Sequence, residues 1–231
     1  TSPLLPPSFL DNASSVAPDQ VVHIAPGCFV TLRWRVQRGP YNAHLVPEPS
    51  VGIPPGAVLA FASSTQASDG VFHDDWDLSW RPSRDFLQRR YPACLMLVDE
   101  LADSTTGPAV QHPREKIRCV EFEMRRCEAC AEAGQTLQHV AAHWFGADWL
   151  QIWGSNPEIV NPDSLPDNAL LRLGPVYHVK PGDTLSRIAR RFGVAVTFLQ
   201  RLNPEVGSGD VLHAGQPLCI LPRVCPPEGY A

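Results

Sequence analysis

The sequence has no long hydrophobic run and no cluster of basic residues. Its longest apolar stretches, such as "CLMLV" at 94–98, are far shorter than the roughly 20 residues that a membrane-spanning helix needs. Lys and Arg total 19 against 24 Asp and Glu, so the net charge is −5. Nucleic-acid-binding surfaces require concentrated positive charge. The sequence therefore predicts neither a membrane span nor a nucleic-acid partner.

A signal peptide and an initial methionine are also missing. The first residue is Thr1, so we expect a processed chain or a piece of a longer one. The triplet Asn12-Ala13-Ser14 fits the N-glycosylation acceptor pattern. Seven cysteines favour an oxidising compartment: Cys28, Cys94, Cys119, Cys127, Cys130, Cys219 and Cys225. Together these features predict a secreted or cell-surface glycoprotein.

Proline, in contrast, is abundant. The chain has 24 prolines in 231 residues, about twice the usual ~5%. This argues against long helical bundles and favours short strands and turns. The length allows two or three domains.

The C-terminal third contains an internal repeat. "GQTLQHVAAHWFGA" (134–147) aligns with "GDTLSRIARRFGV" (182–194), and "SNPEI" (155–159) aligns with "LNPEV" (202–206). The period is 47 or 48 residues because the first copy has one extra residue in its first helix.

Each copy is predicted to fold as β-α-α-β. In the second copy, a strand at 176–180 leads to a turn in which Asp183 or Thr184 can cap a helix. That helix carries one apolar face and ends at Gly193. A second helix at 196–202 ends at Asn203-Pro204, and 217–221 return as a strand.

The stretch 176–222 resembles a LysM domain, with the G-D-T-L turn, the N-P after the second helix and the G-Q before the last strand at the family's spacing. Residues 128–175 resemble a more divergent copy, with Gln135 for the usual Asp and Ser155 for the usual Leu. The resemblance implies binding of polymers that contain N-acetylglucosamine, such as chitin or peptidoglycan. The implied contacts are Gly182, Asp183, Thr184, Leu185, Asn203, Pro204, Glu205 and Val206, with a second site at Gly134, Gln135, Thr136, Asn156 and Pro157.

The residues alone leave another interpretation open. Asp183 could serve only as a helix cap, and Asn203-Pro204 could serve only to end a helix. Trp153, if exposed, could stack on a sugar or anchor a partner, whereas Trp149 occupies a core position of the repeat. If either copy binds an amino sugar, we expect it to be the second, which keeps the family's turn.

Residues 1–127 show the alternation of short strands. "CFVTLRWRV" (28–36) places Cys28, Val30, Leu32 and Trp34 on one face, and "VLAFAS" (58–63), "CLMLVDE" (94–100) and "CVEFEM" (119–124) are further strands. The sequence predicts an antiparallel β-sandwich with a Pro-rich N-terminal arm. "LSWRPSRDFLQRRYPACLMLVDE" (78–100) resembles immunoglobulin/cadherin-like extracellular repeats, with Trp80, Pro82, Tyr91 and Asp99 in the matching places. Such domains are mostly spacers and adhesive modules.

At least three disulfides are expected from the seven cysteines. A hairpin of the last two sandwich strands would bring Cys94 beside Cys119, which is the preferred pair. Cys28 is the rival partner for Cys94, by analogy with immunoglobulin sandwiches. Cys127, Cys130, Cys219 and Cys225 would then join the two LysM-like copies in an undetermined pattern.

No catalytic, metal or cofactor site is predicted. His139 and His143 have ligand spacing on a helix but lack the Glu of a zinc protease. "CEAC" (127–130) lacks a second cysteine pair. "HDDWD" (73–77) could hold calcium through Asp74, Asp75 and Asp77, although such acidic segments are usually only solvated.

Four segments are therefore predicted: a sandwich with its arm (1–127), a divergent LysM domain (128–175), a LysM domain (176–222) and a tail (223–231). The two repeats adjoin at Pro175 without a linker and should form a rigid pair. The expected function is extracellular, non-catalytic binding of an amino-sugar polysaccharide or glycoprotein. One alternative is a structural subunit that packs against extracellular neighbours, including other copies of itself. The other is an accessory segment of a larger cell-wall hydrolase.

Overall fold

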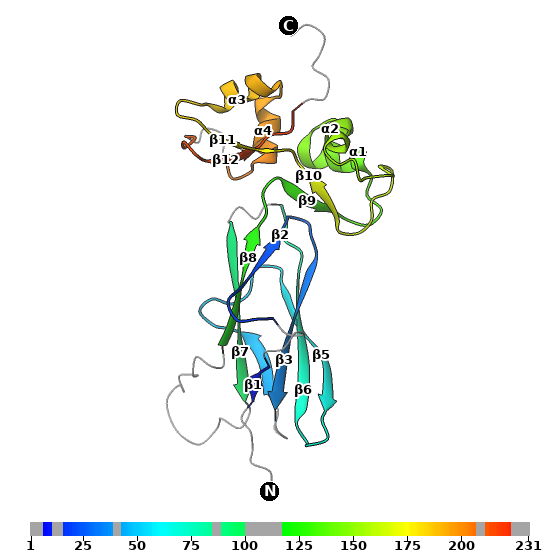
Figure 1. The fold of residues 1–231 in the computed structure, drawn as a ribbon, viewed down its shortest axis with the longest axis vertical. Helices are drawn as coiled ribbons and strands as arrows, with labels where there is room; N and C mark the ends of the chain where they lie inside the picture. Colours follow the sequence, from blue (N-terminus) through cyan, green and yellow to red (C-terminus); the bar gives the residue numbers. More distant parts are fainter. Residues whose placement is uncertain are drawn as a thin grey trace. The chain divides into compact units, whose positions relative to one another are not determined.

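The computed structural model describes residues 7–10, 16–38, 43–84, 89–99, 117–206 and 211–222. The chain divides into two compact units, which are treated separately below (Figure 1). The first comprises Thr1–Ile24, Phe29–Arg81 and Arg89–Glu123, and the second comprises Ala25–Cys28, Pro82–Gln88 and Met124–Ala231. The predicted glycosylation at Asn12 and any bond of Cys225 lie outside the described residues.

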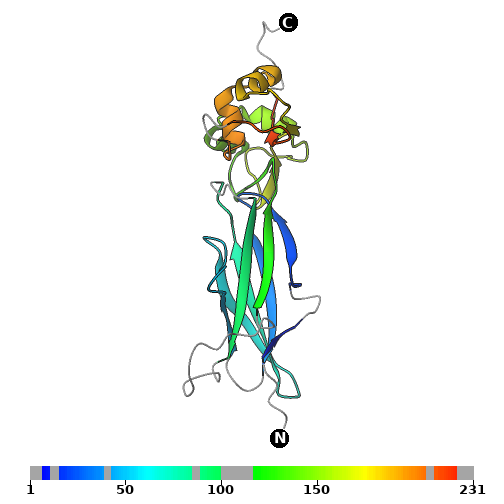
Figure 2. The same cartoon turned by 90° about the vertical axis from the view of Figure 1, so that its left-hand side faces the viewer.

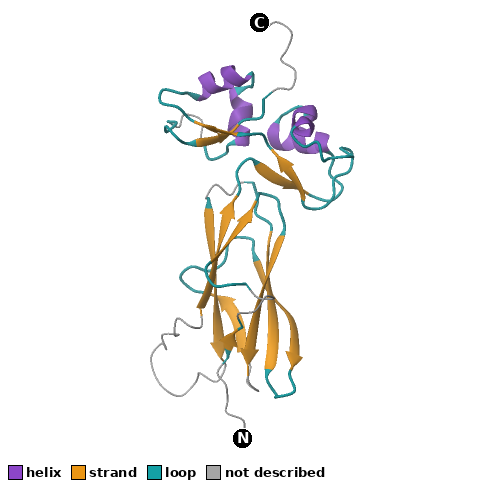
Figure 3. Ribbon diagram, in the orientation of Figure 1, coloured by secondary structure: helices purple, strands orange, loops and turns teal. Residues whose placement is uncertain are grey.

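The first unit is a β-sandwich of two four-stranded sheets (Figures 1 and 3). One sheet has the order β1-β3-β6-β5 and the other β2-β8-β7-β4. The strands are β1 (Ser8–Phe9), β2 (Gln20–Ile24), β3 (Val30–Arg38), β4 (Ala43–Pro47), β5 (Val58–Gln66), β6 (Phe72–Trp80), β7 (Arg90–Asp99) and β8 (Ile117–Met124). The predicted sandwich is thus confirmed at the level of its β-sheet architecture.

Alternating side chains of these strands form the sandwich core. Trp34 and Trp80 are each 1% exposed and Phe122 is fully buried. The Trp80 ring lies 4.9 Å from Phe122 and 5.6 Å from Tyr91, between centroids. Such tilted aromatic contacts add to the burial of apolar area. Of the side chains predicted to share one face, Trp34 is buried, whereas Val30 and Leu32 are half-buried and Cys28 precedes β3.

The acidic segment "HDDWD" lies on β6, and its carboxylates bind arginines of β3. Arg33 and Arg35 bind Asp77 and Asp75 through paired hydrogen bonds of 2.6–2.8 Å, and Arg38 binds Asp74 at 2.5 Å. The pKa of Asp75 is lowered, and the hydrogen bonds from Arg35 are the largest cause. Because neighbouring residues of a strand point to opposite faces, Asp74 and Asp75 do not converge on one cation. The three carboxylates therefore do not form a calcium site.

The three disulfides confirm one predicted pair and correct another expectation. Cys94 and Cys119 lie directly opposite each other on β7 and β8 and are bonded. Cys127 is bonded to Cys219, which joins the two repeats. Cys130 is bonded to Cys28, whereas we expected it to pair within the repeats.

A close approach of two backbones explains the Cys28–Cys130 bond. The N–H of Cys130 donates to the Pro26 carbonyl at 2.8 Å. Gly27 has φ 79°, and a Cβ at this position would overlap the Cys130 carbonyl. Only glycine tolerates both conditions. The segment 25–28 therefore lies along the first strand of the first repeat, which no local pattern around Cys130 indicates.

The second unit contains both repeats, each with the order strand, helix, helix, strand (Figures 1 to 3). In the first repeat, β9 pairs with β10 antiparallel, and in the second, β11 pairs with β12. The second predicted helix, 196–202, is observed with those bounds, and the first is capped by Thr184 and ends at Gly193 as predicted. The elements are β9 (Glu128–Ala131), α1 (Leu137–Val140), η2 (Ala141–Phe145), α2 (Trp149–Gly154) and β10 (Ala169–Arg172), then β11 (Val176–His178), α3 (Leu185–Phe192), α4 (Val196–Leu202) and β12 (Pro217–Cys219).

The extra residue of the first repeat is absorbed by a π-helix. Where the second repeat has the single helix α3, the first has one α-helical turn that continues as the π-helical segment η2. Both end at a glycine in the left-handed conformation, Gly146 with φ 63° and Gly193 with φ 65°. A π-helical turn accommodates one additional residue without shifting the elements on either side.

The two repeats share a hydrophobic core. Phe198 and Leu202 of α4 pack into the cluster formed mainly by the first repeat, which includes Phe145 and Ile152. A Cβ at Gly174, which has φ 88°, would overlap the Ile220 carbonyl, so the backbone segments around Gly174 and Ile220 also approach each other closely. The repeats are thus joined by packing and by the Cys127–Cys219 bond, and the rigidity of the pair stays a prediction.

Candidate functional site

The turn before α3 is held by a network of hydrogen bonds. The Thr184 side chain caps the helix by accepting from the Arg187 N–H at 3.2 Å. Asp183 Oδ2 accepts from the Lys180 N–H at 2.9 Å and from the Tyr177 hydroxyl at 2.6 Å. Arg191 donates to the same hydroxyl at 3.0 Å. The turn is therefore fixed from both sides before any ligand binds.

This network also sets the charges of the turn. The hydrogen bond from Tyr177, followed by that from the Lys180 N–H, lowers the pKa of Asp183. The same contact with Asp183 raises the pKa of Tyr177. Asp183 therefore stays ionised to a lower pH than an ordinary Asp, and Tyr177 stays protonated to a higher pH than an ordinary Tyr.

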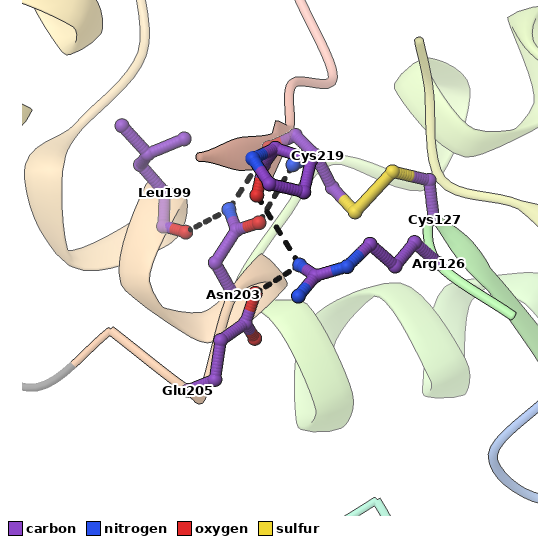
Figure 4. Close-up of a disulfide and its surroundings, with 7 residues drawn as sticks. Arg126, Cys127, Leu199, Asn203, Glu205 and Cys219 are labelled. Atoms are coloured by element: carbon purple, nitrogen blue, oxygen red, sulfur yellow. Dashed lines mark hydrogen bonds and ion pairs between the residues drawn. A yellow bond between two sulfur atoms is a disulfide. The ribbon is translucent and has the colours of Figure 1, made fainter. Parts of the chain in front are cut away.

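Asn203 locks the end of α4 to β12 (Figure 4). Its amide nitrogen donates to the carbonyls of Leu199 at 2.7 Å and Cys219 at 3.0 Å. Its amide oxygen accepts from the Cys219 N–H at 2.6 Å. The side chain is completely buried, so all of its contacts are internal.

Glu205, two residues further on, forms an ion pair that the sequence did not suggest. Arg126 donates to Glu205 at 2.5 Å and to the Pro217 carbonyl at 3.2 Å (Figure 4). Arg126 adjoins Cys127, whose disulfide reaches Cys219. The position of Arg126 beside a cysteine was the only available signal, and it does not specify a partner 79 residues away.

The residues predicted for the site in the second repeat divide by exposure. Gly182, Thr184 and Pro204 are exposed, whereas Asp183, Leu185 and Glu205 are half-buried. Asn203 and Val206 are buried, at 0% and 3% exposure, and lie in the interior instead of on the surface. Leu185 and Val206 both pack on the hydrophobic cluster of the second repeat.

The first repeat reproduces this framework with different side chains. Gln135 Oε1 accepts from the Glu132 N–H at 3.1 Å, as Asp183 does from Lys180. Thr136 caps α1 through the His139 N–H. Asn156 is buried and forms the same three hydrogen bonds as Asn203, here with Ile152 and Arg172. Gly134 and Pro157 are exposed.

The two turns differ in their hydrogen bonds to the following loop. In the first repeat, the N–H groups of Gly134 and Leu137 donate to the carbonyls of Leu165 and Pro162, and the Leu165 N–H donates to the Gln135 carbonyl, at 2.7–3.0 Å. In the second repeat, the turn 182–185 forms no backbone hydrogen bond with the described part of the corresponding loop, residues 211–222. The first turn is closed by its own chain, and the second leaves its backbone groups unbonded to those residues.

The side chains weighed for other roles lie near the first repeat's helices. Trp149 and Trp153 are both half-buried and stack with their centroids 5.3 Å apart. The Trp153 ring N–H donates to the Ile159 carbonyl at 2.9 Å. His139 and His143 are exposed and stacked, 4.2 Å between centroids. The described residues contain no group of three or more potential metal ligands.

The sequence model of the LysM domain family matches residues 177–221. This confirms the predicted LysM domain in the second repeat. Among solved structures, a chain titled "GspB Siglec domain" is similar, with 8% identity, a TM-score of 0.27, and coverage of 57% of the present chain and 62% of the other. The present chain thus spans less than two thirds of that one. None of the described helices is long and apolar enough to cross a membrane.

Proposed function

We propose that the second repeat binds polymers containing N-acetylglucosamine at the surface formed by Gly182, Thr184 and Pro204. The match of the LysM family to residues 177–221 supports this ligand class. An acetamido group offers one donor and one acceptor beside a methyl group. Backbone groups at a helix start can hydrogen-bond the donor and the acceptor, while an apolar side chain such as Leu185 contacts the methyl group.

The observation that carries the proposal is the difference between the two turns. The first repeat uses the N–H groups of Gly134 and Leu137 to bond its own loop, so they are unavailable to a ligand. The corresponding groups of Gly182 and Leu185 have no such bond to residues 211–222. Binding at the N–H groups of Gly182 and Leu185 would therefore break no hydrogen bond to residues 211–222, whereas binding at those of Gly134 and Leu137 would break two in the first repeat.

The other parts of the chain take supporting roles in this proposal. Residues 128–175 are a divergent LysM copy that buries the back of α4 and does not bind ligand. The sandwich is an immunoglobulin/cadherin-like spacer. Three disulfides suit an extracellular protein, because disulfides persist in oxidising compartments.

The test is calorimetric titration of the whole chain with chitin oligomers and with peptidoglycan fragments. A small exposed surface on one module gives weak affinity, on the order of millimolar. Pro204→Trp should block the surface and remove binding. Pro157→Trp, at the equivalent exposed position of the first repeat, should leave the affinity unchanged. Equal loss in both variants, or no binding by the unmodified chain, would refute the proposal.

A further inference from the structure

Strand β5 is an open edge of the sandwich. It pairs with β6 on one side and stands last in its sheet, with no described strand beyond it (Figure 1). Eight of its nine residues are exposed, and Leu59 alone is partly covered. Every second backbone N–H and C=O of such a strand points outward and can pair with another chain.

The strand lacks most features that prevent edge pairing. "VLAFASSTQ" contains no charged residue and no proline, and its one irregularity is a bulge between Phe61 and Ser63. The other edge strands of the two sandwich sheets are protected by their length or sequence. β1 has two residues, β2 has five, and β4 has five and ends in Pro47.

Two large apolar side chains lie exposed on this edge. Val58 is 61% and Phe61 is 52% exposed. Phe61 rests edge-on against Trp76, 5.4 Å between centroids, which holds its ring at the border of the sheet. A neighbouring strand would cover both side chains, so its own contacting residues must be uncharged.

We propose that β5 binds β5 of a second copy of this chain, antiparallel across a twofold axis. Strand edges are self-complementary in this arrangement, and a twofold interface uses the same surface on both partners. The chain carries a net charge of −5, yet β5 is neutral and brings no like charges together. An axis near Phe61 places the two Phe61 rings on the same face of a continuous sheet.

The interface is small, since it involves one strand from each copy. Interfaces of this size are weak and reversible. The dimer is independent of the proposed glycan binding but would present two LysM domains to one polymer. Linked sites raise the overall avidity without new contacts.

The test is sedimentation velocity of the whole chain from about 1 µM to about 1 mM, with charged substitutions of the exposed Ala60. The unmodified chain should dimerise reversibly. Ala60→Lys and Ala60→Glu should each raise the dissociation constant at least about tenfold through like-charge repulsion between the copies. An equimolar mixture of the two variants should restore dimers, which a folding defect would not allow. Val160→Lys, at a site 93% exposed in the other unit, is the control and should dimerise normally.

A chain that stays monomeric throughout would overturn the proposal. So would dimers that Ala60 substitutions do not weaken, variants that fail to associate when mixed, or polydisperse aggregates in place of a dimer.

Discussion

Replacement of Asn203 by alanine should lower the free energy of unfolding of the second repeat by a large amount for a single substitution. The substitution removes three internal hydrogen bonds, two from the amide nitrogen and one to the amide oxygen. The N–H and C=O of Cys219 are then buried without these partners, which costs about 1–3 kcal/mol for each group. We therefore expect a loss of about 3–5 kcal/mol in the free energy of unfolding.

The matched control is Asn156→Ala, which removes the equivalent bonds from the first repeat. The two losses should be similar, because both side chains are completely buried. Since the chain has more than one unit, a single unfolding curve is not sufficient. Hydrogen exchange of the Cys219 amide reports the lock directly. Protection that persists in Asn203→Ala, with a loss below about 0.5 kcal/mol, would refute a structural role and favour a ligand contact.

Three further predictions concern the same unit. Gly174→Ala should lower the free energy of unfolding by at least about 2 kcal/mol, because the residue has φ 88° and no room for a Cβ; urea titration that shows a neutral effect would contradict this. Because its pKa is lowered, ionised Asp183 stabilises the fold above its ordinary pKa of 3.8, and this contribution is lost as the pH falls through the pKa of the folded state. Because its pKa is raised, protonated Tyr177 stabilises the fold below its ordinary pKa of 10.0, and this contribution is lost as the pH rises through the pKa of the folded state. In an NMR titration, Tyr177→Phe should move the pKa of Asp183 upward, and an unchanged value would rule out the hydrogen bond as its cause. Replacing Cys127 and Cys219 by serine opens a loop of 92 residues and should cost about 4–5 kcal/mol in thermal or chemical unfolding, whereas a cost below about 1 kcal/mol would show that packing alone joins the repeats.

The helices of the second repeat could be predicted because their determinants are local. Thr184 caps α3 and Gly193 ends it, and both residue types have strong positional preferences. The alignment of the repeats also located the extra residue of the first copy. Its conformation as a π-helix could not be foreseen, since nothing in "HVAAHWF" (139–145) distinguishes a π-turn from a bulge or a kink.

The pairings between distant segments could only partly be predicted. The hairpin geometry of β7 and β8 indicated Cys94–Cys119, whereas Cys28–Cys130 depends on the backbone approach at Gly27 over 102 residues. The role of Asn203 was also ambiguous, because the residue types that end helices are those that can bind acetamido groups. Burial decides such cases, and burial is a property of the folded chain.

The measurement that tests the central claim most directly is an NMR titration of the isotope-labelled whole chain with a chitin tetramer at millimolar concentration. Amide shifts should change in the turn 182–185 and at residues beside Pro204, and the turn 134–137 should stay unaffected. Changes confined to the first repeat, or no change in either turn, would contradict the account.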